Sequence, residues 1–175
     1  RTATVAVTRG GRLDITQNFL ASGWMGDCEK GEPVCTFTDS WSQNPATPPS
    51  CIRITYRPNS QGWGGVYFQY GEHNWADQPG IDLRGYRRIT FRARAEGNVF
   101  AEFKAGGIRP PGKPHPDSFE VSLGTVKVTP QWQQYSIDLS GRDLRNVVGA
   151  FAWVARGNAN SGGLVLYLDD LAYEE

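Results

Sequence analysis

The feature that most constrains this 175-residue sequence is the strict alternation of apolar and polar residues between positions 88 and 104. A first run, RITFRARA, and a second run, VFAEFKAG, flank Glu96 and Gly97. A period of two residues is typical of a strand with one buried face. The stretch therefore predicts two strands, each with an apolar face and a chemically varied polar face.

We expect these two strands to pair as a hairpin. A two-residue turn at Glu96 and Gly97 would place Glu102 opposite Phe91, which would bring a carboxylate to the core side. A three-residue loop ending at Gly97 instead pairs Phe91 with Ala101 and keeps the apolar faces together. In this register the charged side chains and one aromatic ring share one surface. They are Arg92, Arg94, Glu102 and Lys104, with Phe100 as the ring.

Further strand-like runs are separated by turn signals throughout the chain. They cover residues 1–9, 51–58, 62–71, 118–128, 131–139, 147–155 and 164–173. The 21 glycines and 11 prolines are typical of a turn-rich β protein, and helix is expected only as turns near 82–84 and 142–146. About nine strands without alternating helices predict an all-β fold, an antiparallel β-sandwich of the jelly-roll type, as a single domain over residues 1–175.

Charge and hydropathy exclude several classes of partner. Eighteen basic and 18 acidic residues cancel, so no electrostatic field favours nucleic acid or an anionic membrane. Apolar runs stay well below the roughly 20 residues that span a bilayer. We expect a soluble, monomeric, secreted chain whose targeting segment has been removed or lies outside this sequence.

The three cysteines, Cys28, Cys35 and Cys51, all lie in the first third of the chain. One disulfide and one free thiol is the simplest arrangement. We favour Cys28 with Cys35, because they close a short loop containing Gly and Pro, with Cys51 buried as a free thiol. Three reduced core cysteines are the alternative.

Five segments together resemble the jelly-roll, galactose-binding-like carbohydrate-binding modules of bacterial glycoside hydrolases. They are SGWMGD (22–27), GWGGVYFQYGEHNWADQPGIDLRGYRRITFRARAEG (62–97), EFKAGG (102–107), WQQYSIDLSGRDLRNVVGAFAWVA (132–155) and LYLDDLAY (166–173). The resemblance implies a module that grips a glycan on the concave face of one sheet and holds a structural calcium elsewhere. It also implies fusion to a glycoside hydrolase.

The residues themselves agree with a glycan site. A sugar ring has an apolar face and a rim of hydroxyl groups, so its site needs flat aromatic rings and planar polar groups. The polar candidates are Arg92, Arg94, Glu102, Lys104 and Asn74, and the aromatic candidates are Tyr67, Trp75, Phe100 and Trp153. Each has another interpretation: Trp153 could be core, Trp75 could cap the sandwich edge, and the charged set could be a solvated ion-pair ladder.

Calcium requires hard oxygen ligands where loops or termini converge. Asp169 and Asp170 are adjacent in the last predicted strand, and Asp27 lies in a loop near the other terminus. These three are the candidate ligands, and hydrogen-bonded carboxylates without metal are the alternative.

The sequence offers little for catalysis. Nothing in the spacing of Glu72, Glu102 and Glu120 pairs them as glycosidase carboxylates, and nucleophile and metal motifs are absent. A lyase with His73 or Tyr67 as base and Arg94 neutralising a uronate is the alternative function. The favoured hypothesis is non-catalytic binding of a β-glucan or related plant polysaccharide.

Overall fold

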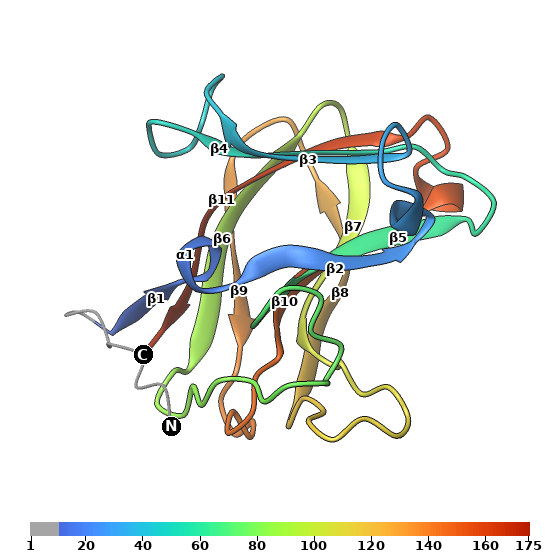
Figure 1. Cartoon of the computed structure of the whole chain (residues 1–175). Helices are drawn as coiled ribbons and strands as arrows, with labels where there is room; N and C mark the ends of the chain where they lie inside the picture. Colours follow the sequence, from blue (N-terminus) through green and yellow to red (C-terminus); the bar gives the residue numbers. More distant parts are fainter. Residues whose placement is uncertain (1–10) are drawn as a thin grey trace.

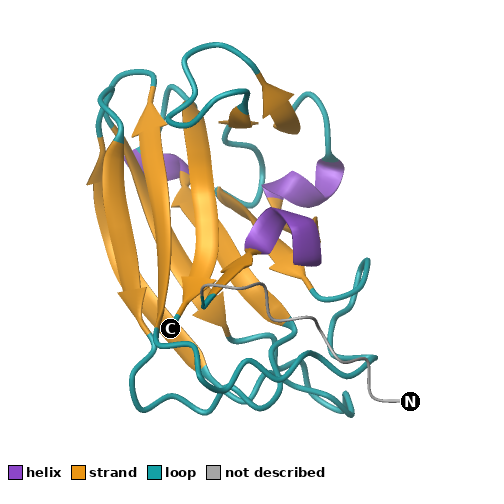
Figure 2. Ribbon diagram, turned by 90° about the vertical axis from the view of Figure 1, so that its left-hand side faces the viewer, coloured by secondary structure: helices purple, strands orange, loops and turns teal. Residues whose placement is uncertain are grey.

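The computed structural model describes residues 11–175 and consists of two antiparallel sheets packed face to face (Figures 1 and 2). We call them sheet A, with the order β3-β4-β11-β6-β9 and β1 paired to β11, and sheet B, with the order β2-β5-β10-β7-β8. The predicted β-sandwich is therefore confirmed. The strand predicted for residues 1–9 lies outside the described residues.

The elements have these bounds. Sheet A contains β1 (Arg12–Asp14), β3 (Cys35–Trp41), β4 (Cys51–Tyr56), β6 (Arg88–Ala95), β9 (Gln133–Asp138) and β11 (Leu164–Glu174). Sheet B contains β2 (Leu20–Gly26), β5 (Trp63–Gln69), β7 (Val99–Gly106), β8 (Glu120–Val128) and β10 (Gly149–Arg156). The helical pieces are α1 (Ile15–Asn18) and the 3-10 turns η1 (Asp27–Lys30) and η2 (Gly157–Ala159).

Three strands are absent from the sequence prediction: β1, β2 and β3. Strand β2 reads LASGWMG, which has no apolar period, and β3 reads CTFTDSW, whose alternation is carried mainly by threonines. Both form because they pair along strands that do alternate, β2 with β5 and β3 with β4. The turns at 82–84 and 142–146 are not helical in the structure.

The core is an aromatic cluster between the sheets. Phe91 of sheet A meets Phe103 and Phe151 of sheet B, with ring centroids 4.8 and 5.0 Å apart. Trp153 is fully buried beside them in the same core. The prediction of Trp153 as a sugar platform is therefore wrong, because the phase of β10 turns its indole inward and its neighbours Ala152 and Val154 outward.

The predicted hairpin between β6 and β7 is also wrong. Strand β6 pairs with β11 and β9 in sheet A, whereas β7 pairs with β10 and β8 in sheet B. The chain crosses from one sheet to the other at Glu96 to Asn98, so Phe91 and Phe103 pack face to face across the sandwich. Arg92 and Arg94 consequently lie on the outside of sheet A, and Glu102 and Lys104 on the outside of sheet B.

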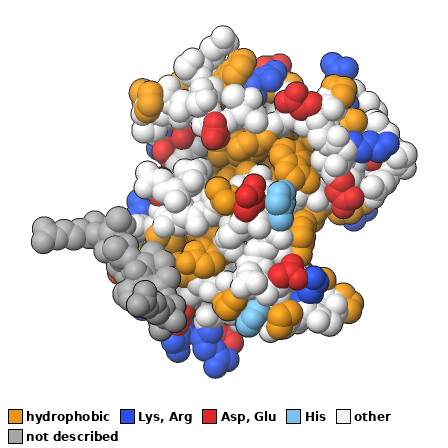
Figure 3. Space-filling view, viewed as in Figure 1, with side chains coloured by type: hydrophobic (Ala, Val, Ile, Leu, Met, Phe, Trp, Pro, Cys, Tyr) orange, Lys and Arg blue, Asp and Glu red, His pale blue; other side chains and the backbone are white. Residues whose placement is uncertain are grey.

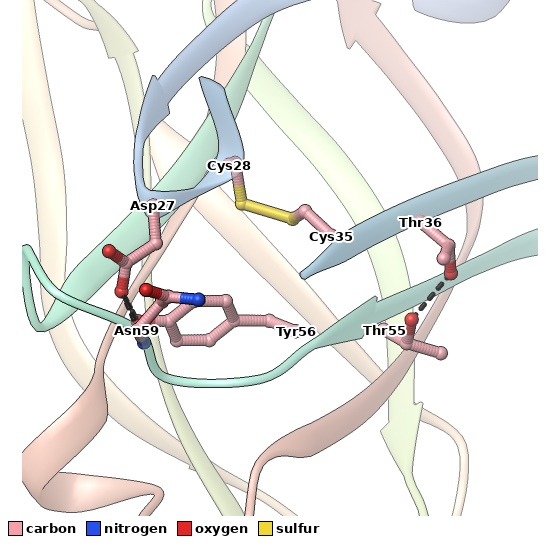
Figure 4. Close-up of a disulfide and its surroundings, with 7 residues drawn as sticks. All are labelled: Asp27, Cys28, Cys35, Thr36, Thr55, Tyr56 and Asn59. Carbon is pink, nitrogen blue, oxygen red and sulfur yellow. Dashed lines mark hydrogen bonds between the residues drawn. A yellow bond between two sulfur atoms is a disulfide. The ribbon is translucent and has the colours of Figure 1, made fainter. Parts of the chain in front are cut away.

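The predicted disulfide between Cys28 and Cys35 is present, and Cys51 is a buried free thiol (Figure 4). The disulfide joins η1 to the start of β3. Beside it, the fully buried carboxylate of Asp27 accepts hydrogen bonds from the Tyr56 hydroxyl and the backbone N–H groups of Asn59 and Gln61, at 2.7 to 2.8 Å. Burial alone would raise the pKa of Asp27, but these donors outweigh it and the pKa is lowered.

We predict that losing this disulfide lowers the free energy of unfolding by about 2 kcal/mol. The disulfide closes a short loop in the unfolded chain, and opening that loop raises the conformational entropy of the unfolded state. Urea unfolding with and without reductant measures the difference. The Cys28→Ser/Cys35→Ser variant is the control and should not respond to reductant. A wild-type midpoint that is unchanged on verified reduction would contradict the prediction.

Candidate functional site

The outer face of sheet B has small side chains at its centre. One row across the sheet runs Met25, Gly65, Val154, Glu102 and Thr125, in register from β2 to β8. The next row runs across the same strands from β2 to β8 through Gly23, Tyr67, Ala152, Lys104 and Ser122. Glycine, alanine and valine occupy most of the middle positions of these two rows, and we call the surface that the rows form along β5 and β10 the trough.

Two exposed rings flank this trough at one end. Trp63 at the start of β5 is 37% exposed and Phe100 at the start of β7 is 39% exposed. Trp63 shares the outward phase of Gly65 and Tyr67, and its ring packs so closely on Gly26 that a Cβ there would lie 2.9 Å from the ring. Strands β5 and β7 are separated by β10, so the backbones that carry the two rings are about 10 Å apart across the sheet.

The polar side of the trough is formed by β7 and β8. The Ser122 hydroxyl donates a hydrogen bond to the Glu102 carboxylate, and Lys104 lies 3.6 Å from the Glu120 carboxylate. Lys104 also stands 5.9 Å above the centre of the Tyr67 ring. These contacts hold a carboxylate and an ammonium beside the small residues of β10, where both can meet the hydroxyl groups of a ligand.

Two loops build a wall at the other end of the trough. Residues 71–80 and 107–117 cover this part of sheet B, where a small second apolar cluster gathers. Its members are Tyr67, Ala76, Ile108, Val148, Ala152, Met25 and Trp75. Trp75 is half-buried and meets the Tyr67 ring edge-on at 6.2 Å, so one indole face belongs to the wall.

Tyr67 and Asn74 support this wall instead of contacting a ligand. The Tyr67 hydroxyl donates to the Gly106 carbonyl at 2.8 Å, and the ring is buried. The Asn74 amide bonds the backbone of Tyr70 and Gln78 and is buried too. The prediction that these two side chains bind sugar directly is corrected, since their polar atoms are already satisfied within the protein.

The second wall loop is anchored by one buried carboxylate. Asp117 accepts hydrogen bonds from the backbone N–H groups of Ile108, Val148 and Gly149, at 2.6 to 3.2 Å. Desolvation outweighs these bonds and raises the pKa of Asp117 to about 6. This titrating group therefore helps to hold the loop over sheet B, together with the Asn146 amide, which donates to the His115 and Pro116 carbonyls.

The outer face of sheet A holds Arg92 and Arg94. Arg92 is exposed and lies 3.7 Å from the Asp170 carboxylate, and Arg94 is half-buried against Tyr167. The sandwich separates both from Glu102, Lys104 and Tyr67. The predicted shared surface, and the lyase arrangement of Tyr67 with Arg94, are therefore wrong. Burial also raises the pKa of Tyr67, so its hydroxyl stays protonated and the phenolate that a base would need is not available.

The three predicted calcium ligands do not meet. Asp27 is hydrogen-bonded to Tyr56 at one end of β4. Asp169 lies next to Leu168, which pairs with Ile52 near the other end of β4. Tyr56 and Ile52 are four residues apart, which is about 13 Å along the strand. Asp169 and Asp170 accept hydrogen bonds from the backbone N–H and the hydroxyl of Thr47. Within residues 11–175 no group of three or more His, Cys, Asp or Glu side chains gathers as a metal site, so these residues do not fit the ion. Calcium binding stays a prediction.

A separate hollow of about 620 Å³ opens at the edge of the sandwich between β2 and β3. Figure 3 shows hydrophobic side chains at the bottom of a hollow on this side of the molecule. Its apolar lining includes Phe19, Phe37 and Phe68, which belong to the rim of the core. Because these rings pack against the core, they offer a ligand no free flat face comparable to Trp63 or Phe100.

Trp63 is not among the aromatic candidates named from the sequence, although it is the most exposed tryptophan side chain of the trough. The signal that finds it is phase: Trp63, Gly65 and Tyr67 alternate with the core residues Val66 and Phe68.

No long apolar helix that could cross a membrane occurs in the described part of the chain.

Comparison with known proteins supports the architecture. No protein-family model matches the chain, and no curated protein matches its sequence. Among solved structures, the family 11 carbohydrate-binding module of Clostridium thermocellum, in complex with a β-1,3-1,4-mixed-linked tetrasaccharide, aligns with a TM-score of 0.62 at 13% identity and covers 94% of each chain.

Two further solved structures show the same likeness. A family 30 carbohydrate-binding module aligns with a TM-score of 0.58 at 15% identity, covering 93% of this chain and 87% of the other. The xylan-binding CBM22-1 domain of Paenibacillus barcinonensis Xyn10C has a TM-score of 0.53 at 10% identity, with 93% and 91% covered. At these identities the similarity shows that the chain has the β-sandwich fold of these modules.

We predict that Asp117 makes stability depend on pH. Its folded pKa of about 6 lies above the ordinary value of 3.8, so between the two the folded state binds more protons than the unfolded state. The contribution of this group to the free energy of unfolding is therefore complete when the pH is below 3.8. It is lost as the pH rises from there through about 6. Urea unfolding of the wild type and Asp117→Asn over this range measures it. Parallel pH profiles for the two proteins would contradict the prediction.

Proposed function

We propose that this chain is a non-catalytic polysaccharide-binding module whose ligand lies in the trough on the outer face of sheet B. The observation that carries the proposal is the placement of the exposed rings. Of three large hydrophobic side chains exposed in the described residues, two, Trp63 and Phe100, flank the trough of Gly65 and Val154. Exposed rings beside a polar rim are typical of a surface that meets a ligand.

The chemistry of the trough suits a neutral glycan. Aromatic faces pack against the C–H face of a pyranose ring, while Glu102 accepts and Lys104 donates hydrogen bonds to its hydroxyl groups. The charges of Lys104 and Glu120 are paired, so the polar side of the trough carries no strong field of one sign. A β-linked glucan, with alternating apolar faces and equatorial hydroxyl groups, is the ligand we propose.

The fold similarity supports the class of ligand. The family 11 structure holds a mixed-linked tetrasaccharide and the CBM22-1 domain is described as xylan-binding. The likeness extends over nearly the whole chain, and these structures are named as binding modules. We therefore propose binding without catalysis, for a secreted bacterial chain that acts as a monomeric accessory domain of a glycoside hydrolase.

Removing either ring should weaken glycan binding. We predict that Trp63→Ala and Phe100→Ala each raise the dissociation constant for mixed-linked β-glucan about tenfold, because a stacked ring contributes about 1.5 kcal/mol. Calorimetric titration or affinity electrophoresis measures the change. Thermal midpoints close to the wild type establish that the variants are folded.

Leu20→Ala is the matched control, because Leu20 is 52% exposed but lies at the opposite end of β2 from Met25. It should bind like the wild type. If no β-glucan, xylan or mannan retards the wild-type protein, or if Leu20→Ala weakens binding as much as the ring variants do, the proposal is wrong.

A further inference from the structure

The outer face of sheet A carries a row of side chains that the trough does not use. In register across three adjacent strands, Arg53 of β4 lies beside Tyr167 of β11, which lies beside Arg94 of β6. Trp41, at the end of β3, and Trp132, just before β9, stand at the two ends of the row. We call these five residues the arginine-aromatic row.

Rings and guanidinium groups alternate along this row. The Arg53 guanidinium lies 4.7 Å from the centre of the Trp41 ring, and that of Arg94 lies 3.9 Å from Tyr167 and 5.3 Å from Trp132. Stacking covers the flat faces of the guanidinium groups and fixes their planes. What stacking leaves available on each group is its edge, which carries the N–H donors.

These two arginines differ from the other arginines of sheet A in their charge balance. Arg88 and Arg92 lie within 4.0 Å of Glu174 and Asp170, respectively. Among the described residues, neither Arg53 nor Arg94 has a carboxylate within that distance. The nearby carboxylate of Glu96 accepts instead from the Tyr167 hydroxyl at 2.6 Å. The two half-buried guanidinium groups thus make no direct ion pair within residues 11–175, although Arg53 is hydrogen-bonded to the same Tyr167 hydroxyl.

Unsatisfied donors gather in the same row. The Nε atoms of Arg53 and Arg94 and the indole Nε1 of Trp41 are buried without a hydrogen-bond partner. Loop 42–50 crosses beside them, because the Trp132 indole donates to the Asn44 carbonyl at 3.0 Å. Trp41, Arg53, Arg94 and Trp132 all remain partly exposed. Buried donors without acceptors are costly, but these three atoms are themselves closed to a ligand, so an external acceptor would meet the terminal amino groups of the two half-buried arginines.

We propose that the arginine-aromatic row is a second glycan site, specific for sugars that carry a carboxylate. A carboxylate accepts two parallel N–H bonds from a guanidinium edge, and the backbones of the two arginines lie about 10 Å apart on either side of β11, so two acidic residues of one sugar chain can be held. Trp41 and Trp132 offer rings to the sugars at either end. The site takes a short acidic oligosaccharide, whereas the trough on sheet B takes a neutral one.

The row is independent of the proposed function, because the two sites lie on opposite faces of the sandwich and share no residue. The test uses tetragalacturonate, with its fully methyl-esterified form as the matched ligand without charge. We expect the wild type to bind the acid and not the ester, with an affinity that falls as NaCl is raised. Arg53→Gln and Arg94→Gln should each weaken binding about tenfold, since each removes one charge-assisted pair.

Controls separate binding from folding. Arg57→Gln removes an exposed arginine just after β4 and should bind tetragalacturonate like the wild type. Arg53→Lys and Arg94→Lys keep the charge but lose the planar fork, and should fall between the wild type and the Gln variants. If the Gln variants lose stability, the Lys variants still report on binding. Trp63→Ala should weaken the binding of β-glucan but not of tetragalacturonate. Arg94→Gln should weaken the binding of tetragalacturonate but not of β-glucan.

Three outcomes would overturn the proposal. The first is no binding of tetragalacturonate by the folded wild type. The second is equal binding of the acid and its ester. The third is binding of sulfate, added as sodium sulfate at the same concentration of charge, as tight as that of tetragalacturonate. This result would show an anion site that does not recognise the sugar. Binding of the acid that the Arg53 and Arg94 variants abolish, while β-glucan binding is retained, supports it.

Discussion

The packing of Phe91 against Phe103 is the contact on which the rest of the structure depends. These rings, 4.8 Å apart, join β6 of one sheet to β7 of the other, although only three residues separate the two strands. Because side chains alternate along a strand, burying both apolar faces against each other sends the two polar faces in opposite directions. One short segment of sequence thereby contributes to two different surfaces of the molecule.

Those two surfaces have different chemistry for reasons visible in their central strands. In sheet B, outward positions of β10 carry the small side chains of Ala152 and Val154, and the facing position of β5 is Gly65, over which the Val154 and Met25 side chains close. In sheet A the corresponding centre is Tyr167, filled and flanked by arginines. The first surface therefore favours contact by shape and stacking, and the second favours charge-assisted hydrogen bonds. The loops reinforce this difference, because Asp117 anchors a wall over sheet B and Thr47 ties loop 42–50 to sheet A.

Much of this fold was predictable from the sequence, because periods of two residues report burial directly. The inward phase of Ile89, Phe91, Ala101 and Phe103 and the disulfide of Cys28 were predicted correctly. The pairing of β6 with β7 was not, since alternation does not distinguish strands beside each other in one sheet from strands facing each other in two. Of the candidate site residues named from the sequence, Trp75, Phe100, Glu102 and Lys104 lie on the trough or its wall, and their contact with a ligand stays a prediction. It misplaced Arg92 and Arg94, because that placement rested on the pairing.

The two faces of the sandwich are chemically different, and we propose that sheet B holds the neutral glycan. Backbone amide chemical shifts, followed during titration with a mixed-linked β-glucan oligosaccharide, distinguish the two faces. We expect changes along β5, β7 and β10, centred on Gly65, Glu102 and Val154, with β4, β6 and β11 unaffected. Changes centred on Arg53, Tyr167 and Arg94 instead, or spread evenly over both sheets, would contradict it.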